Sequence, residues 1–490
     1  MNNHSTGFLL VLSVLMFGCQ NQPEQQMMNP DGPSTNETAD CRTAYPGLVS
    51  TIAGHLADAG APGAAIAIVT NGQLACASGI GMKDVQSETA ATGQTLFLIN
   101  SMSKVFTAAA AMTEVENGTL DLNAPITTYV PSLALAAPWD PSTITMDTLL
   151  DHTSGYPNGF EMAPGDMVPY NSPSALPAFF AYYTDIPLWS PPGAVWNYSN
   201  FGYALAGLVV SQVAQQEIGD YVQHVVLAPT GMTTATYDPS VAIAGDHATG
   251  YAPTGSTFSP EDLSEDTSYF CRPFCGLMAS AEDMGHFMEM LLAGGGQTLA
   301  ASSVQTLTSA HAATGNADVS YGYGLFIEPQ PSVTLIEHSG GGTAFVSDFE
   351  FIPERQYGFV ILVNDGGYSG VYEDRLAARQ AVLGLSAYTP SGASTPPTTW
   401  ARYAGTYFDP VSFGTIQVTV PGDKLHLHFV EHSFDTTCQQ ADQDSFQCDQ
   451  VPPWLPEANE LSELPLTFFA DITGTVRYLA TRLGVATRPQ

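Results

Sequence analysis

The sequence predicts an α/β (α+β) fold in which an antiparallel sheet is flanked by helices and joined to an all-α lobe, followed by a small C-terminal β-barrel or sandwich. Extended apolar segments stand at both ends of the region before residue 385, with mostly helical patterns between them. After a stretch rich in Pro, Ser, Thr and Gly, short alternating segments separated by turns take over. The two patterns indicate two globular domains.

The elements of the first domain follow from local signals. Residues 63–74 predict a β-hairpin because Asn71-Gly72 is a two-residue turn signal. Residues 101–116 have apolar side chains at helical spacing and end at the helix stop Asn117-Gly118, and residues 120–299 predict the helical lobe. A helix at about 370–385 follows extended segments at Tyr321–Ile327, Thr334–His338, Phe345–Ile352 and Tyr357–Val363.

The second domain begins near Trp400, after an expected linker at 389–399. Its strands are expected at Gly405–Tyr407, Thr415–Val420, Leu425–Val430, Leu466–Phe469 and Val476–Ala480. The expected division is therefore an export signal at 1–18, a tether at 19–44, a first domain at 45–388, the linker, and a β-domain at 400–490.

Composition and charge exclude some classes of function. The 490 residues are 44% hydrophobic and 10% aromatic, which is enough for large cores and unlike a disordered chain. The net charge of −35 reflects few basic residues, since Lys83, Lys104 and Lys424 are the only lysines. Such a surface repels nucleic acid and anionic membrane surfaces, so we expect no nucleic-acid partner.

The N-terminus predicts export. The apolar run Phe8–Phe17 is too short to span a bilayer and ends at Gly18-Cys19, as an export signal does. Residues 15–19 resemble a bacterial lipoprotein cleavage box in which Cys19 would be lipidated, although Phe17 and His4 depart from the usual pattern. We expect a periplasmic or outer-membrane lipoprotein with a lipid anchor in a bacterial membrane, or a secreted protein.

The cysteines predict disulfides. An even number remains when the lipidation candidate is set aside, in a chain expected in an oxidising compartment. These are Cys41, Cys76, Cys271, Cys275, Cys438 and Cys448. The sequence leaves the connectivity open. If the cysteines closest in sequence pair, Cys271 with Cys275 and Cys438 with Cys448, then Cys41 is left with Cys76. The alternative is a metal site, although the spacings match no familiar zinc pattern.

Ser101-Met102-Ser103-Lys104 is the first motif with chemical meaning. Residues three apart on a helix share a face, so Ser101 Oγ and Lys104 Nζ can meet. A serine needs a nearby base to become a nucleophile, and a buried lysine can supply one. The alternative is a solvated helix start with a surface lysine.

Tyr198-Ser199-Asn200 is the second motif, on a loop that enters a helix. A tyrosine beside Lys104 could relay a proton, and the Asn200 amide could orient the lysine or bind a substrate carbonyl. The alternative is a helix N-cap with a packed tyrosine.

His338-Ser339-Gly340-Gly341-Gly342 is the third motif, at the end of an expected strand. Glycines there let the backbone approach a ligand and leave an N–H group facing an oxyanion. The alternative is a glycine-rich turn with a structural histidine.

Six segments in this order resemble the successive signatures of the β-lactamase-related, penicillin-binding-protein-like serine hydrolases. That family includes class C β-lactamases, D-alanyl-D-alanine carboxypeptidases, D-aminopeptidases and family VIII esterases. The segments are Phe97–Lys104, Leu149–Gly155, Tyr198–Asn200, Gly276–Ser280, Tyr321–Gly324 and His338–Gly340. The resemblance spans about 46–385 and becomes specific through the order of its weak parts.

The resemblance implies acyl transfer in the first domain, with no cofactor. Ser101 would attack a carbonyl, and Lys104 with Tyr198 would handle the proton while an acyl-enzyme forms and is hydrolysed. The backbone N–H groups of Ser101 and Gly341 would form the oxyanion hole. The other substrate-side residues are Asn200, His338, Ser339 and Gly340.

His338 departs from the Lys-Thr-Gly triplet of many relatives. A lysine there helps to bind a substrate carboxylate, and a neutral histidine offers less charge. The sequence therefore favours an esterase, or a peptidase of D-amino-acid or other small peptides, over a true β-lactamase. The alternative from another class is a catalytically silent binding or sensor protein at the cell surface.

Two histidine groups have simpler explanations. His426 and His428 alternate on one expected strand, near His432, and exposed strand histidines are commoner than metal ligands, so no metal site is predicted. His152-Thr153-Ser154-Gly155 lacks the glycine pattern of an α/β-hydrolase elbow and predicts a structural turn near the site.

Overall fold

The computed structural model describes residues 38–158, 171–254, 257–261, 267–316, 318–387, 397–410, 412–455, 464–481 and 484–489. The expected export signal and Cys19 lie outside these residues. The expected tether is described only from Thr38 onward, and there the chain is folded, because helix α1 occupies Cys41–Ala44. None of the helices in the described part combines the length and apolar character that crossing a membrane requires.

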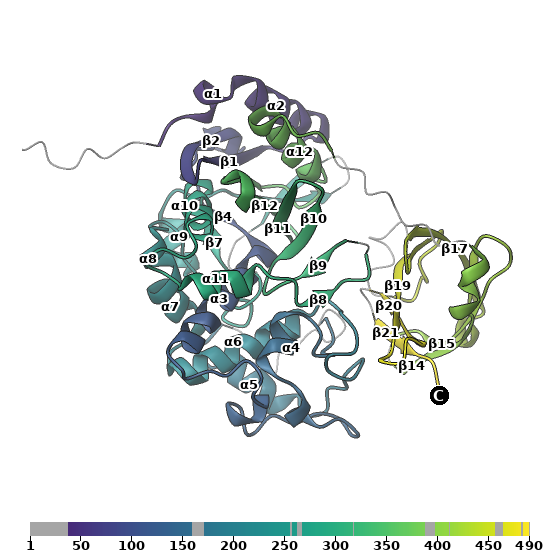
Figure 1. The fold of residues 1–490 in the computed structure, drawn as a ribbon. Helices are drawn as coiled ribbons and strands as arrows, with labels where there is room; N and C mark the ends of the chain where they lie inside the picture. Colours follow the sequence, from purple (N-terminus) through teal and green to yellow (C-terminus); the bar gives the residue numbers. More distant parts are fainter. Residues whose placement is uncertain are drawn as a thin grey trace, which may run out of the picture. The chain divides into compact units, whose positions relative to one another are not determined.

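One nine-stranded antiparallel sheet organises the first domain, as predicted (Figure 1). The early and late segments meet where β1 pairs with β13, with Ala64 opposite Val363 and Ile66 opposite Ile361. In sheet order the strands are β3 (Thr89–Ala90), β2 (Gln73–Asp84), β1 (Gly63–Thr70), β13 (Tyr357–Val363), β12 (Val346–Ile352), β11 (Val333–Gly341), β10 (Phe326–Gln330), β9 (Ser320–Tyr321) and β8 (Ala312–Ala313).

Both faces of this sheet are buried at β1, one of its interior strands. Ile66 and Ile68 of β1 pack in the same cluster as α2 (Pro46–Ala59) and α12 (Val371–Leu383), which lie side by side in Figure 1. Ala65 and Ala67 point to the opposite face, because side chains alternate along a strand, and join the cluster of α10 (Ala281–Leu292) and α3 (Ser103–Glu116). This two-sided burial explains why β1 is apolar along its whole length.

The middle of the chain forms the expected helical lobe around α3, whose run of four alanines is fully buried and which packs against α6. The remaining helices are α4 (Met146–Leu150), α5 (Ala175–Tyr182), α6 (Asn200–Ala214), α7 (Ile218–Val222), α8 (Ala228–Thr230), α9 (Pro239–Ala244) and α11 (Ala301–Leu307). Two small ladders, β4 (Phe97–Leu98) with β7 (Met278–Ala279) and β5 (Gly250–Thr254) with β6 (Thr257–Glu261), accompany them. Short turns of other helix types occupy Asn100–Met102, Ile126–Thr128, Pro141–Thr143, Gln223–Leu227, Pro353–Arg355, Pro397–Arg402 and Val430–His432.

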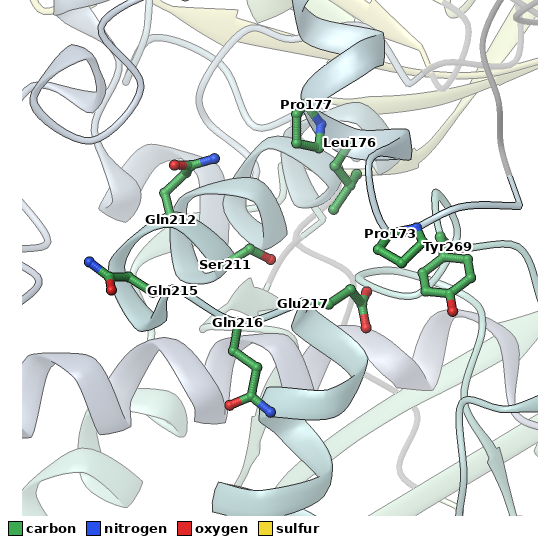
Figure 2. A pocket seen from close by; sticks show the side chains of 9 residues that line it. All are labelled: Pro173, Leu176, Pro177, Ser211, Gln212, Gln215, Gln216, Glu217 and Tyr269. Atoms are coloured by element: carbon green, nitrogen blue, oxygen red, sulfur yellow. The ribbon is translucent and has the colours of Figure 1, made fainter.

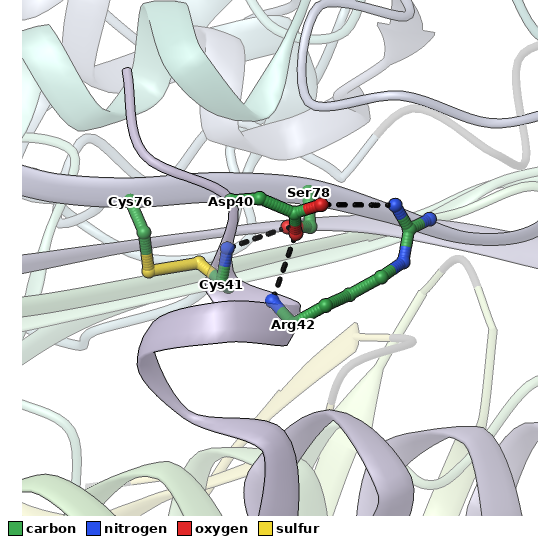
Figure 3. The surroundings of a disulfide bond; sticks show 5 residues. All are labelled: Asp40, Cys41, Arg42, Cys76 and Ser78. Atoms are coloured by element: carbon green, nitrogen blue, oxygen red, sulfur yellow. Dashed lines mark hydrogen bonds and ion pairs between the residues drawn. A yellow bond between two sulfur atoms is a disulfide. The ribbon is translucent and has the colours of Figure 1, made fainter.

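Two of the expected disulfides are present. Cys41–Cys76 joins α1 to β2, and the Cys41 N–H donates to Ser78 Oγ at 2.7 Å beside it (Figure 3). Cys438–Cys448 joins two paired strands of the C-terminal domain. The first bond therefore ties the start of the folded chain to the main sheet.

The third expected pair was wrong, since Cys271 and Cys275 are not joined by a disulfide. The N–H groups of Phe274, Cys275 and Gly276 all donate to Cys271 O, which winds these residues into a helical turn. Side chains four residues apart on such a turn have Cβ atoms roughly 5–6 Å apart. A disulfide needs a Cβ separation of roughly 3.5–4.5 Å, so closeness in sequence does not suffice.

The C-terminal domain is a closed eight-stranded antiparallel barrel, which decides between the barrel and the sandwich. Leu425, Leu427 and Phe429 face its core, and His426 and His428 between them are partly exposed. The strands are β14 (Gly405–Asp409), β15 (Gly414–Thr419), β16 (Leu425–Phe429), β17 (Phe434–Asp442), β18 (Ser445–Cys448), β19 (Leu464–Ala470), β20 (Val476–Thr481) and β21 (Gly484–Thr487). Most of the expected linker, residues 389–396, lies outside the described residues.

Candidate active site

Ser101 and Lys104 meet as the helical spacing predicts. Ser101 lies in the short turn Asn100–Met102 that leads into α3, and Lys104 follows in the first turn of that helix. Lys104 is fully buried, and its Nζ donates to Ser101 Oγ at 3.0 Å and to Phe274 O at 3.1 Å. The alternative of a solvated surface lysine is therefore wrong.

The turn that carries Ser101 is held by β12 and by the segment before it. Asn100 has a left-handed backbone with φ of 49°, which asparagine tolerates better than most residues. Its Nδ2 donates to Phe345 O at 2.9 Å, and Ser347 Oγ donates to Ile99 O at 2.8 Å. These bonds fix the backbone on the N-terminal side of Ser101.

Glycines at the end of β11 and directly after it allow the chain to lie against the same turn. A Cβ added at Gly340 would collide with Ile99 O, and one added at Gly342 would lie 2.8 Å from Asn100 Oδ1. A Cβ at Gly341 would meet nothing within 4 Å in the described part of the chain. Gly340 and Gly342 thus serve close packing, whereas the space beside the Gly341 Cα is open.

The second motif divides its work between two neighbours. Ser199 caps α6, because its Oγ accepts from Gly202 N–H at 2.8 Å. Lys104 Nζ lies 4.6 Å from the centre of the Tyr198 ring. Asn200 begins α6, and its Oδ1 is buried without a hydrogen-bond partner among the described residues. Ser199 therefore stabilises the start of α6, whereas Tyr198 lies against Lys104.

His338 is neutral and already bonded on both sides. Its Nδ1 lies 2.5 Å from Ser339 O, and because a carbonyl only accepts, Nδ1 carries the proton. Nε2 then accepts from the Tyr321 hydroxyl at 3.0 Å. Burial, with Lys104 nearby, lowers the pKa of His338 to about 3, and burial holds the pKa of Tyr321 well above its usual range. His338 therefore presents no positive charge to a substrate.

The sequence did not predict the roles of three residues at the site, two of which, Tyr321 and Gly324, belong to one signature segment. Phe274 supplies a main-chain carbonyl to Lys104, which no side-chain pattern can reveal. Tyr321, quoted only as part of a motif, binds His338. Gly324, with φ of 76°, lets the following chain pass α3, since a Cβ there would lie 2.7 Å from Val105 Cα.

Comparison with known proteins places this geometry in a family. The family model described as Beta-lactamase matches residues 48–383, more than half of the chain. The chain belongs to the β-lactamase family. Its fold is that of serine hydrolases with serine acyl-enzyme chemistry.

The three relatives described next share at most 30% sequence identity with this β-lactamase-family chain. It is 30% identical over 305 residues to Protein flp of Staphylococcus aureus. The aligned segment covers 62% of this chain and 59% of Protein flp, so the chain spans less than two thirds of this relative's length. The octameric penicillin-binding protein homologue from Pyrococcus abyssi is 24% identical with a TM-score of 0.61, over 90% of this chain and 99% of the other. The class C β-lactamase from Rhodobacter sphaeroides is 20% identical with a TM-score of 0.57, over 69% and 98%. The two structures show likeness of fold alone.

A cavity elsewhere on this β-lactamase-family protein is unrelated to these residues. It has a volume of about 420 Å³ and is lined by residues of α5, of the end of α6 and of the segment between α6 and α7 (Figure 2). None of the expected site residues is among those lining it, which are Pro173, Leu176, Pro177, Ser211, Gln212, Gln215, Gln216, Glu217 and Tyr269. It therefore adds nothing to the chemistry at Ser101.

The barrel histidines bind a carboxylate of their own domain. His428 Nδ1 lies 2.9 Å and His426 Nε2 3.2 Å from Asp435 Oδ1, and all three side chains are at least one-third exposed. Among the described residues no group of three or more His, Cys, Asp or Glu side chains could hold a metal ion.

Proposed function

We propose that this protein is an exported serine hydrolase that cleaves an ester or amide through an acyl-enzyme on Ser101. The observation that carries the proposal is the 3.0 Å contact between Ser101 Oγ and the buried Lys104 Nζ. A nucleophile and its base within hydrogen-bond reach, with the base held by a third group, is the signature of covalent catalysis. Phe274 O is that third group.

The chemistry proceeds in two halves. Ser101 Oγ attacks the substrate carbonyl while its proton passes to Lys104 Nζ, which must be uncharged at that moment. The backbone N–H groups of Ser101 and Gly341 stabilise the oxyanion, and Tyr198 beside Lys104 relays the proton to the departing alcohol or amine. A water then gives a proton to the same groups and attacks the acyl carbon. That proton passes on to Ser101 Oγ as its bond to the acyl carbon breaks, which releases the acid and regenerates the serine hydroxyl and the base.

The neutral state of His338 supports substrates without a carboxylate at this position. A lysine there would offer a charge-assisted bond to an anionic substrate, whereas His338 is closed off by Tyr321 and Ser339 O. We therefore rank esters and small or D-amino-acid peptides ahead of β-lactams.

A substrate panel tests this function. Short-chain nitrophenyl esters, D-alanyl peptides and a chromogenic cephalosporin are given to wild type, to Ser101→Ala, and to Ser302→Ala as a control at an exposed serine of α11. We expect turnover of esters or peptides that Ser101→Ala abolishes and the control retains. Turnover that survives Ser101→Ala would remove Ser101 from the mechanism, and a cephalosporin as best substrate would reverse the ranking.

We also propose export, with lipidation at Cys19. The apolar run before Cys19 and the two disulfides support it, because disulfides persist in oxidising compartments. Full-length protein expressed in a Gram-negative host should appear in the membrane fraction and incorporate labelled fatty acid. Cys19→Ala should lose the label, and label retained in that variant would refute lipidation.

A further inference from the structure

His152 contacts three consecutive residues, Asn197, Tyr198 and Ser199. The His152 carbonyl accepts from Asn197 N–H at 2.9 Å, and its Nδ1 accepts from Ser199 N–H at 3.1 Å. Between those two bonds, the imidazole ring lies 4.3 Å from the Tyr198 ring. One buried side chain and its own main chain thus fix the residue before Tyr198, Tyr198 itself and the residue after it.

The surroundings of the imidazole leave it little freedom. His152 is 1% exposed, and its ring also lies 4.7 Å from Tyr321 and 5.0 Å from Tyr203. Its Nε2 is buried without a hydrogen-bond partner among the described residues, so that its N–H faces aromatic rings. Because the enclosed His152 ring cannot move freely, the Tyr198 ring that packs against it is held in place as well.

The protonation state is set by the same contacts. Because Nδ1 accepts from a main-chain N–H, the proton of the neutral ring lies on Nε2. Burial, then Lys104 and His338, hold the pKa of His152 well below its ordinary value. A second proton would meet the Ser199 N–H head-on and add a cation beside Lys104.

The backbone at this position is unusual for its residue type. His152 has φ of 63°, in the left-handed region, directly after α4 and one residue beyond its cap Asp151. Histidine, asparagine and aspartate enter this region more readily than other non-glycine residues, and such conformations gather at functional sites. The left-handed turn is what lets both the carbonyl and the ring of His152 reach the Tyr198 segment.

We infer that His152 is a positioning residue that holds Tyr198 next to Lys104 for proton transfer. The inference rests on the proposed function, because Tyr198 matters only if Ser101 is acylated. His152 has no part in the bond-making steps, and it acts through the orientation of Tyr198.

A double-mutant cycle with Tyr198 tests this inference. His152→Phe keeps a ring and removes the acceptor, whereas His152→Asn keeps an acceptor and tolerance for the left-handed turn and removes the ring. His286→Phe on α10, where His286 pairs with Glu289, is the matched control. Each is combined with Tyr198→Phe, and kcat, KM, thermal unfolding and the rate of Ser101 labelling by a fluorophosphonate are measured.

We expect His152→Phe to lower kcat about 100-fold with KM nearly unchanged, the loss that a displacement of about 1 Å produces. In the Tyr198→Phe background the same change should cost less than threefold, because residues acting as one unit are not additive. Should His152→Phe fail to fold, the His152→Asn cycle gives the same comparison.

Each outcome decides between distinct claims. Additive losses in a folded variant, or wild-type kcat, would overturn the positioning role. Absence of labelling in the wild type would overturn the proposed function itself, and with it this inference.

Discussion

Replacing Lys104 with methionine removes the amino group but keeps an unbranched stem in a fully buried site. The variant loses the bonds of Nζ to Ser101 Oγ at 3.0 Å and to Phe274 O at 3.1 Å. A positioned general base contributes roughly 10²- to 10⁴-fold in rate. At about 1.4 kcal/mol for each tenfold change, the acylation barrier should rise by roughly 3–5 kcal/mol.

The stability of this variant should change much less than its rate. Methionine relieves the cost of burying the polar amino group, while Phe274 O loses a donor at a cost of roughly 1–3 kcal/mol. Because these effects oppose each other, we expect the free energy of unfolding to stay within about 2 kcal/mol of wild type. Lys104→Ala should have the same acylation rate as Lys104→Met but a lower free energy of unfolding, because it also leaves a cavity.

Labelling by a fluorophosphonate, followed by intact mass against time, gives the acylation rate, and urea unfolding gives the stability. A folded Lys104→Met variant that is acylated at the wild-type rate would refute the assignment of Lys104 as base.

Three further predictions concern other parts of the molecule. Lowering the pH from 6.5 to 5 should reduce the free energy of unfolding by roughly 2 kcal/mol through His338 alone, because the unfolded chain binds a proton that the folded chain, with a pKa of about 3, does not. In urea titrations the free energy of unfolding of His338→Gln should depend less steeply on pH than that of the wild type. An equal pH dependence would show that His338 is not the cause. Gly340→Ala should slow the fluorophosphonate labelling of Ser101 far more than Gly341→Ala does, since only the first Cβ collides with main chain, and equal slowing would speak against that packing. Replacing Cys41 and Cys76 with alanine should lower the free energy of unfolding by up to about 4 kcal/mol, the chain-entropy value for a 35-residue separation, and an unchanged melting temperature would disprove it.

The sheet and the helical lobe could be predicted because their signals are local. Strand β13 is apolar throughout and α3 repeats its apolar side chains at helical spacing, so each pattern matches its burial. Strand β17 was missed because Phe434–Asp442 buries few side chains and reads as polar chain. Helix α1 was missed within the expected tether, since it is four residues long and anchored by Cys76 from a distant strand.

The same distinction holds at the site. Ser101 and Lys104 lie three residues apart, so helix geometry alone predicted their contact. The partner of His338 depends on the pairing of β9, β10 and β11, which brings Tyr321 to it, and no spacing rule contains that register. His152 was expected as a structural turn near the site, and its grip on the Tyr198 segment depends on a left-handed backbone.

Intact-mass measurement with a fluorophosphonate tests the central claim most directly. The wild type should gain the mass of one phosphonyl group, peptide mapping should place it on Ser101, and Ser101→Ala should gain none. An unmodified wild type, or an adduct of the same size on folded Ser101→Ala, would contradict acyl transfer through Ser101.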